Sequence, residues 1–582
     1  MFTFIRKNFL FILATLIVGT VSVLPQIISV VHLGNEYKGI PFIYTANEDT
    51  YLARIREVVD GHPLVGSAFF YEYKNWRPIV PAIGENLYAI PTLLFSVPLL
   101  SVLAASKFVL PAVLFILVSL LILRLSTDPQ SKWTQINAVV GGLIVTLGYD
   151  IFDYQHFYNL LVNPADAFSL SVWTRPINPI LGAIFLFVFL LLILKITEQR
   201  KKIYIIPAAI VWALSVGYIF SWTLILAIVG LFILLFIIKK DFTLVKQLVV
   251  LVLLWLVLTL PYWYGLVSSL NNSVAGVTAA ARNGIFLTHR PIINKITLAF
   301  TLVFLGFSGC FRWCKRDKNA LENWWYALAI FMAASWAAFN QQIITGRTVW
   351  YHHYVQYTIP LGIVVVMVLL NNWVRPVLFK VWTAAIIGIV LCIGFYNFVD
   401  LRAIRYRYVD FKNLQSYAPI LSWINKNAAK ECVVLNQDTP VRFELLVSAF
   451  TGCDSYAPSW VFDGVPAERI RHDYLVMLRL RGISPELVGQ YLSDNETEVR
   501  SYFFKDWDQM FGHGPDPYIT EVIDGLAKDY TVFFKGNFVD ELKKYKLDYI
   551  LFVGSPSPGL LKSLPGITPA FQYDNFYLYR FN

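Results

Sequence analysis

The sequence predicts a polytopic α-helical membrane protein of about eleven transmembrane helices, followed by a C-terminal extracytoplasmic α/β domain. Of its 582 residues 57% are hydrophobic and only 15% charged, against about 25% charged in an ordinary soluble domain. Apolar runs of bilayer-spanning length, about 20 residues, recur up to Phe398 and then stop. This composition excludes a soluble globular protein and divides the chain into a membrane domain at 1–398 and an outer domain at 399–582.

The net charge of +10 is unevenly divided between these two parts. Residues 1–398 hold 28 Lys/Arg against 15 Asp/Glu, whereas residues 399–582 hold 20 against 23. Basic residues beside membrane spans report orientation, because they stay on the cytoplasmic side. A nucleic-acid partner would instead need a basic surface facing its phosphates, so we expect none.

The membrane domain contains twelve apolar segments that could each form a span. The first follows Arg6 and Lys7 and has no small-residue cleavage site, so we read it as an uncleaved span rather than a signal peptide. If all twelve crossed, the basic connector 195–202 would lie opposite Arg6 and Lys7, against the positive-inside rule. The segments are 8–31, 87–105, 108–125, 135–152, 177–195, 203–220, 223–238, 246–265, 294–311, 324–341, 357–370 and 381–398.

Removing one early crossing restores the charge asymmetry. Segment 87–105 carries Pro91 and Pro98 and lacks a clear helix start, so we interpret it as a juxtamembrane or re-entrant segment. The remaining eleven spans predict a multi-pass protein of the cytoplasmic membrane with its N-terminus inside and its C-terminal domain outside. The outer side then receives a long first loop at 32–86 and three further loops, 153–176, 266–293 and 342–356.

The outer domain reads as alternating strands and helices. Short apolar runs predict strands at 433–435, 549–553 and 576–581, and amphipathic spacing predicts helices at 466–480 and 539–546. The chain has five cysteines and no CxxC pair, so neither a disulfide scaffold nor a Cys/His metal site is expected. Cys432 and Cys453 could pair if their domain lies outside, or could remain two free thiols.

The first outer loop carries the most informative motif, a helix predicted over residues 47–62. Asn47 is placed to cap it, Glu48 and Asp49 suit its positive first turn, and Gly61 can end it. A carboxylate here could act as a general base; the plainer reading is that the acidic pair only favours the helix dipole. An apolar stripe, expected to lie on the membrane or against the spans, is formed by Leu52, Ile55 and Val59.

The other outer loops supply possible partners for an anionic substrate. Arginine forks bind phosphate oxygens well, although a single arginine near a span can equally be an interfacial anchor. No dinucleotide fingerprint or phosphate-binding P-loop motif occurs. The candidate substrate-binding residues are Asp153, Arg175, Arg290, Arg347, His352 and His353.

This layout resembles the GT-C superfamily of integral membrane glycosyltransferases, which includes oligosaccharyltransferases, protein mannosyltransferases and aminoarabinose transferases. The resemblance lies in a first span, a long outer loop opening on Glu48-Asp49, a proline-bearing segment, many further spans and an outer C-terminal domain. It implies a GT-C-like fold and an inverting hexosyl or pentosyl transfer from a polyprenyl phosphate or pyrophosphate to a glycan, lipid or protein acceptor. The resemblance places the catalytic base or metal ligand at Asp49 or Glu48.

Two departures from the family pattern leave parts of this reading open. The acidic pair of this chain runs Glu-Asp, whereas many family members have a pair that begins with Asp. The resemblance therefore does not decide whether a divalent cation, Mg²⁺ or Mn²⁺, is required. No WWD-like motif occurs in the outer domain, which speaks against recognition of a peptide sequon. A transporter or flippase, which would place ionisable groups mid-span, and a non-catalytic envelope-assembly protein remain the alternatives. An enzyme predicts that Asp49, an arginine and a histidine converge on one outer cavity.

Overall fold

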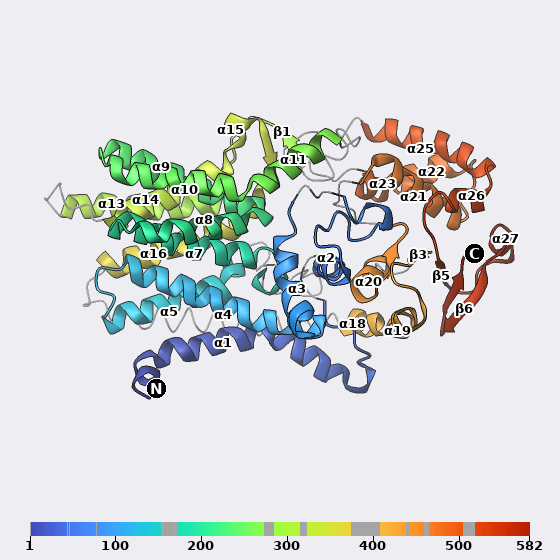
Figure 1. Ribbon diagram of the computed structural model, residues 1–582, viewed down its shortest axis with the longest axis horizontal. Helices are drawn as coiled ribbons and strands as arrows, with labels where there is room; N and C mark the ends of the chain where they lie inside the picture. The colour runs from blue at the N-terminus through green and yellow to red at the C-terminus, as the bar shows by residue number, and fades with distance from the viewer. Residues whose placement is uncertain are drawn as a thin grey trace.

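The computed structural model describes residues 2–43, 45, 47–76, 78, 80–152, 158, 162, 172–272, 285–314, 323–373, 408–437, 443–458, 465–503 and 518–582. Figure 1 shows a bundle of long helices at one end of the molecule and the C-terminal α/β region at the other. Two helices of the long loop that follows the first apolar helix, α2 (Glu48–Asp60) and α3 (Ile83–Phe95), lie between these parts. The candidate site therefore has to be sought where the three parts meet.

Six helices in the described ranges are long and apolar enough to cross a membrane. A seventh span would be the pair α10 (Phe242–Leu258) and α11 (Leu260–Asn272), which is bent by 54°. Segment 381–398 lies outside the described residues, so the count of eleven and the orientation stay predictions. The six are α1 (Phe2–Leu33), α4 (Leu99–Leu125), α7 (Ile180–Gln199), α9 (Ile219–Ile238), α14 (Asn323–Phe339) and α16 (Val355–Trp373).

The remaining bundle helices are not among these candidate spans. They are α5 (Lys132–Leu147), α8 (Ile205–Leu214) and α13 (Lys295–Cys314). The predicted spans 203–220 and 246–265 are both broken, which the apolar pattern alone did not reveal. The first break is a 3₁₀ turn, η7 (Ser215–Gly217). The second precedes Pro261, because a proline fits the first turn of a helix and disfavours helical backbone before it.

Treating residues 87–105 as one juxtamembrane segment was wrong in its second half. Helix α3 ends at Ser96, whose φ of 55° is left-handed, and α4 begins directly after Pro98. Residues 99–105 thus open a 27-residue apolar helix. The 13 residues of α3 extend about 20 Å, short of the ~30 Å hydrocarbon core. Pro98 decides the boundary, since it cannot continue a helix but can precede one.

The C-terminal region contains a five-stranded sheet in the order β4-β3-β5-β7-β6. The two central pairings confirm the three predicted strands: β3 (Val433–Asn436) and β5 (Tyr549–Val553) are parallel, and β7 (Phe576–Arg580) runs antiparallel to β5. The sheet edges are β4 (Asp454–Ser455) and β6 (Thr568–Tyr573).

Helices cover this sheet and its neighbourhood. The predicted helix 466–480 is confirmed as α21 (Ala467–Leu480), whereas 539–546 shortens to α26 (Phe538–Leu542). Cys432 and Cys453 form a disulfide that joins the starts of β3 and β4. The other helices are α18 (Tyr408–Gln415), α19 (Ala418–Asn427), α20 (Phe443–Phe450), α22 (Val488–Asp494), α23 (Glu496–Phe503), α25 (Tyr518–Lys535) and α27 (Pro558–Lys562).

Helix α2 belongs to the same apolar core as the C-terminal sheet. Its buried Leu52 and Ile55 join a cluster that contains Val433 and Leu435 of β3 and continues to Leu181 of α7. Helix α2 packs against α3 on one side and α20 on the other. The expected contact with the spans is therefore present, but the sequence did not show that the C-terminal domain encloses this helix. This packing fixes where the acidic first turn points.

Candidate functional site

The first turn of α2 is held by Glu48 rather than by Asn47. Asn47 adopts a left-handed φ of 59° and makes no side-chain cap, so the predicted cap was wrong. Glu48 Oε2 instead accepts hydrogen bonds from the Thr45 N–H at 3.2 Å and the Thr45 hydroxyl at 3.0 Å. Glu48 Oε1 lies 2.5 Å from Nζ of Lys107 on α4, and both side chains are buried. Both oxygens of this carboxylate are therefore engaged.

Asp49 occupies the neighbouring position with a different set of contacts. Its Oδ1 accepts a hydrogen bond from the Thr50 N–H at 2.8 Å, and the Thr50 hydroxyl lies 3.4 Å away. The residue is 8% exposed. Because Glu48 is committed to an ammonium and to Thr45, Asp49 is the better candidate for accepting a proton from a substrate.

Helix α3 contacts α2 through an ion pair and fixes its position beside the bundle helices. Arg54 of α2 donates to Glu85 of α3 at 2.6 Å. Tyr88 of α3 is buried next to Ser106, the backbone of Ile177 and Glu48, and burial raises the pKa of Tyr88 to about 12. The first turn of α2 is thus connected through Tyr88 to the segment that leads into α7.

A buried arginine lies next to this turn. Arg175 follows η5 (Val172–Thr174) and donates through Nε to the carbonyl of Asn178. Its Cζ lies 5.7 Å from the centre of the Tyr51 ring on α2, and its guanidinium also hydrogen bonds to Tyr218. The Tyr218 hydroxyl in turn lies 2.7 Å from Nδ1 of His353. Four segments far apart in the sequence thereby place an arginine, a tyrosine and a histidine in contact.

Close packing of α7 against α16 supports this cluster. A Cβ on Gly182 of α7 would lie 2.3 Å from the hydroxyl oxygen of Tyr357 on α16. Only glycine therefore allows the two helices to approach this closely here. The Tyr357 hydroxyl donates to the carbonyl of Pro179 at 3.3 Å, and its ring packs edge-on against Tyr218 at 6.0 Å.

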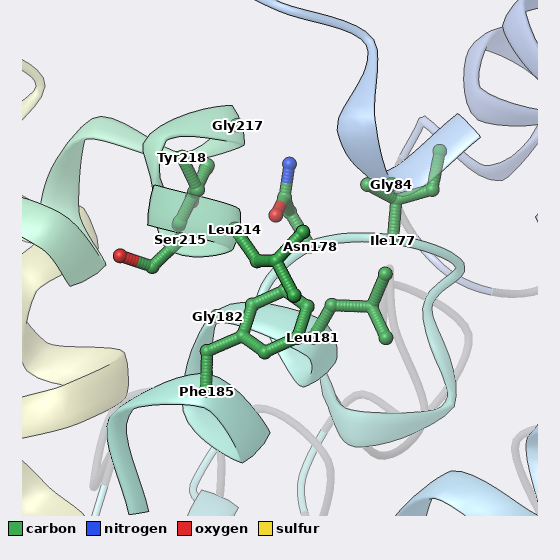
Figure 2. Close-up of a pocket in the computed structure, with 10 residues that line it drawn as sticks. All are labelled: Gly84, Ile177, Asn178, Leu181, Gly182, Phe185, Leu214, Ser215, Gly217 and Tyr218. Atoms are coloured by element: carbon green, nitrogen blue, oxygen red, sulfur yellow. The ribbon is translucent and has the colours of Figure 1, made fainter. Parts of the chain in front are cut away.

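A pocket adjoins the cluster at the N-terminal end of α7 and the C-terminal end of α8 (Figure 2). Asn178 and Tyr218 belong both to its lining and to the contacts of Arg175. Most of the other lining side chains are apolar, so the pocket combines an apolar wall with a polar edge next to a guanidinium. The lining residues are Gly84, Ile177, Asn178, Leu181, Gly182, Phe185, Leu214, Ser215, Gly217 and Tyr218.

The structure places Arg290 and Arg347 elsewhere. Both are exposed and lie at a two-stranded ladder in which β1 (Ile285–Leu287) pairs with β2 (Arg347–Val349). Figure 1 shows β1 beside α15 (Gln342–Thr345) at the edge of the bundle, away from α2. His352 is half-buried, with its ring 4.5 Å from that of His353. Asp153 lies outside the described residues. The predicted set thus divides into a buried cluster and an exposed ladder.

The described residues do not offer a ready metal site. Within those ranges no three His, Cys, Asp or Glu side chains come together, and the Lys107 ammonium occupies the Glu48 carboxylate that a cation would need. Hard divalent cations prefer several oxygen ligands. Participation of a divalent cation, Mg²⁺ or Mn²⁺, therefore stays a prediction.

Sequence reasoning missed Lys107, Tyr51 and Tyr218. Lys107 had a detectable signal, because it is the one charged residue between Glu85 and Arg124, and such isolated charges in apolar helices need a partner. The two tyrosines had none, since aromatic residues are abundant throughout this chain and most of them pack in apolar cores.

Comparison with family models and with curated protein sequences finds no match. Solved structures do match. ArnT from Cupriavidus metallidurans bound to undecaprenyl phosphate is 12% identical with a TM-score of 0.46, covering 99% of this chain and 98% of that one. Archaeal oligosaccharyltransferase AglB from Archaeoglobus fulgidus, in complex with an inhibitory peptide and a dolichol-phosphate, is 12% identical with a TM-score of 0.43, covering 94% and 70%.

Both matched proteins are GT-C glycosyltransferases, the superfamily that the sequence resembles. ArnT in the apo state gives a similar result, with 12% identity and a TM-score of 0.47. At this level of similarity no residue role passes from those proteins to this chain, so its chemistry has to be argued from its own side chains.

Proposed function

We propose that this chain is a membrane glycosyltransferase that moves a sugar from a polyprenyl-(pyro)phosphate donor to an acceptor at the outer face of the cytoplasmic membrane. The observation that carries the proposal is the buried contact of Arg175 with Tyr51 of α2 on one side and Tyr218 on the other. It brings a phosphate-binding group next to a helix whose first turn bears Asp49.

The proposed reaction is a single inverting displacement at the anomeric carbon. Asp49 accepts the proton of the acceptor hydroxyl as the acceptor oxygen attacks that carbon. The bond from the anomeric carbon to the phosphate oxygen breaks, and its electron pair leaves with the polyprenyl (pyro)phosphate. The guanidinium of Arg175 offsets the charge that develops on the leaving phosphate.

The surrounding residues position these two groups. The Glu48–Lys107 pair fixes the first turn of α2 against α4, and His353 orients Tyr218 through Nδ1. Arg290 and Arg347 are exposed on a separate ladder, so interfacial anchoring suits them better than contact with the reacting phosphate.

The test is sugar transfer by the purified full-length chain in proteoliposomes, supplied with a panel of polyprenyl-linked sugars. Replacing a general base costs about 10²- to 10⁴-fold in rate, so Asp49→Asn should lower transfer by at least about 100-fold. Asp60→Asn is the matched control, because Asp60 lies at the other end of the same helix and pairs with Arg56, one helical turn away, at 2.7 Å. It should leave transfer unchanged.

Other outcomes would favour the alternative functions. Full transfer by a chain carrying both Asp49→Asn and Glu48→Gln would exclude these carboxylates from the chemistry. Movement of the donor across the bilayer without transfer would indicate a transporter or flippase. A chain that binds an envelope partner but transfers nothing from any donor would indicate an assembly protein.

A further inference from the structure

Three charged side chains are buried together where α2 meets the C-terminal sheet. Lys74 Nζ lies 3.1 Å from Oδ2 of Asp454 and 3.3 Å from Oε1 of Glu57. The side chains are 4%, 0% and 5% exposed, in the order Lys74, Asp454 and Glu57. Lys74 follows the turn η2 (Tyr71–Tyr73) of the first outer loop, Glu57 belongs to α2 and Asp454 opens β4. The contact therefore joins two regions that are 380 positions apart in the sequence.

The backbone holds the amine and the carboxyl group rigidly against each other. The Gly66 N–H donates to the Lys74 carbonyl at 2.9 Å, and a Cβ on Gly66 would lie 2.3 Å from the Trp76 carbonyl oxygen. The Asp454 N–H donates to the Cys432 carbonyl at 2.7 Å, and the next N–H, of Ser455, donates to the Phe69 carbonyl at 2.9 Å. Fixed geometry of this kind raises the effective concentration of two reacting groups by many orders of magnitude.

The cluster holds one ammonium for two carboxyl groups. Burial raises the pKa of Glu57 and raises that of Asp454 well above its ordinary value. Within the described part of the chain, Oδ1 of Asp454 and Oε2 of Glu57 accept no hydrogen bond. An uncompensated buried carboxylate costs several kcal/mol, so one of the two carries a proton. The cluster is then neutral as a whole.

A proton shift inside this neutral cluster produces a reactive pair. Burial alone would lower the pKa of Lys74, but its two carboxyl neighbours raise it, so the ammonium is the starting form. Transfer of its proton to the remaining carboxylate leaves a neutral amine beside two neutral carboxylic acids. This step removes two buried charges and adds none, and a low-dielectric surrounding favours it for that reason.

We propose that Lys74 and Asp454 join in an intramolecular isopeptide bond, with Glu57 transferring the protons. Nζ of Lys74 attacks Cγ of the protonated Asp454 carboxyl group and forms the new C–N bond. Glu57 takes one proton from the nitrogen and returns one to the departing hydroxyl group, which leaves as water. Amine plus carboxylic acid gives amide plus water, so no oxidant, reductant or energy source is needed and Glu57 is regenerated.

Two features assign the amide to Asp454 and the proton transfer to Glu57. Asp454 is fully buried on β4, so its carbon is held in one place. Glu57 lies on a helix near His62, which is partly exposed and hydrogen bonds Glu431 at 2.8 Å. The Glu57 side chain is 5% exposed, against 0% for Asp454. The bond would fasten the first outer loop to the sheet, independently of the proposed transferase activity.

The test is peptide mapping by mass spectrometry of the purified full-length chain after reduction of its disulfide. The wild type should yield one branched peptide that contains Lys74 and Asp454, with a mass one water below the sum of the two linear peptides. Glu57→Gln keeps the shape but removes the proton-transferring acid, so both peptides should be linear. Glu468→Gln is the matched control on the exposed side of α21 and should keep the branched peptide.

The wild type alone can overturn the proposal, whatever the variants do to folding. Two linear peptides of unmodified mass would show that the cluster is an ordinary salt bridge. A branch between Lys74 and Glu57 would overturn the assignment of Asp454. A branched peptide at the wild-type level in Glu57→Gln would exclude Glu57 as the proton-transferring group.

Discussion

A buried lysine from another segment contacts α2 near each of its ends, but the two clusters differ in their ratio of carboxyl groups to ammonium groups. At the first turn one carboxylate, Glu48, meets one ammonium, Lys107, and Thr45 donates two further hydrogen bonds. Near the last turn two carboxyl groups, Glu57 and Asp454, share Lys74. In the first cluster the charges of Glu48 and Lys107 balance, so this pair serves to fix the position of α2. The second contains a surplus carboxyl group that must carry a proton, and a group of that kind is poised to react.

The difference also separates what each cluster touches. Lys107 lies on α4, so the first cluster ties α2 to the membrane helices. Lys74 and Asp454 tie the same helix to the C-terminal sheet. Since removing one partner of a buried pair leaves the other charge uncompensated, substitutions at the two ends should have different and separable effects.

The largest expected effect comes from breaking the Glu48–Lys107 pair at the first turn of α2. Lys107→Met leaves Glu48 buried without its ammonium and should lower the free energy of unfolding by about 3–5 kcal/mol, measured by thermal unfolding in detergent. Sugar transfer should fall with it, because the first turn that carries Asp49 loses its tie to α4. The double variant Lys107→Met/Glu48→Gln should recover part of the stability, since no unpaired charge remains. A single variant as stable as wild type would show that the pair contributes nothing.

The next effect concerns the Cys432–Cys453 disulfide, which lies beside the Lys74 cluster. Cys432 directly follows Glu431, and Cys453 directly precedes Asp454. Replacing both cysteines by alanine should cost about 3 kcal/mol, the value for a closed loop of this order of length. Hydrogen exchange should speed up around β4 and Lys74 while the first turn of α2 stays protected. Equal loosening at both ends would mean that α2 responds as one unit.

A third prediction compares the buried arginine near the first turn with an exposed one. Arg175→Gln should lower the rate of sugar transfer about 10- to 100-fold, the usual value of a hydrogen bond to a charged group. Arg347→Gln, on the exposed ladder, should change it less than about fivefold. Larger loss with Arg347→Gln would move the phosphate site to the β1–β2 ladder.

The smallest effect should come from an exposed pair that serves as the baseline for both buried clusters. Lys412 donates to Glu36 at 2.7 Å, and this hydrogen bond lowers the pKa of Glu36. A lowered carboxyl pKa stabilises the fold above the unfolded pKa, and that contribution is lost as the pH falls through the folded pKa. Because solvent screens the pair, Glu36→Gln should leave the unfolding temperature at pH 7 unchanged within error. A clear decrease would show that exposed pairs matter here as well.

Local signals predicted a good part of the structure. The acidic start and the Gly61 end of α2 were readable from the residues themselves, as were the strands at 433–435 and 549–553, because caps and apolar periodicity act within a few positions. Helix breaks were harder. Gly217 and Pro261 interrupt runs that remain apolar throughout, so hydropathy alone could not separate one bent or broken helix from a continuous span.

Local sequence signals are enough to show that the chain is rich in membrane-length apolar helices, that an α/β region follows them, and that an acidic helix start lies in the long loop after the first apolar helix. Packing of the whole chain was needed to bring the partners together: Lys107 with Glu48, Lys74 with Asp454, and Arg175 with Tyr218, whose hydroxyl in turn contacts His353. The difference comes from the distance along the chain over which each kind of interaction acts. Propensity and periodicity act over one or two helical turns, whereas burial forces each charged group to find its partner among segments brought together only by packing of the whole chain.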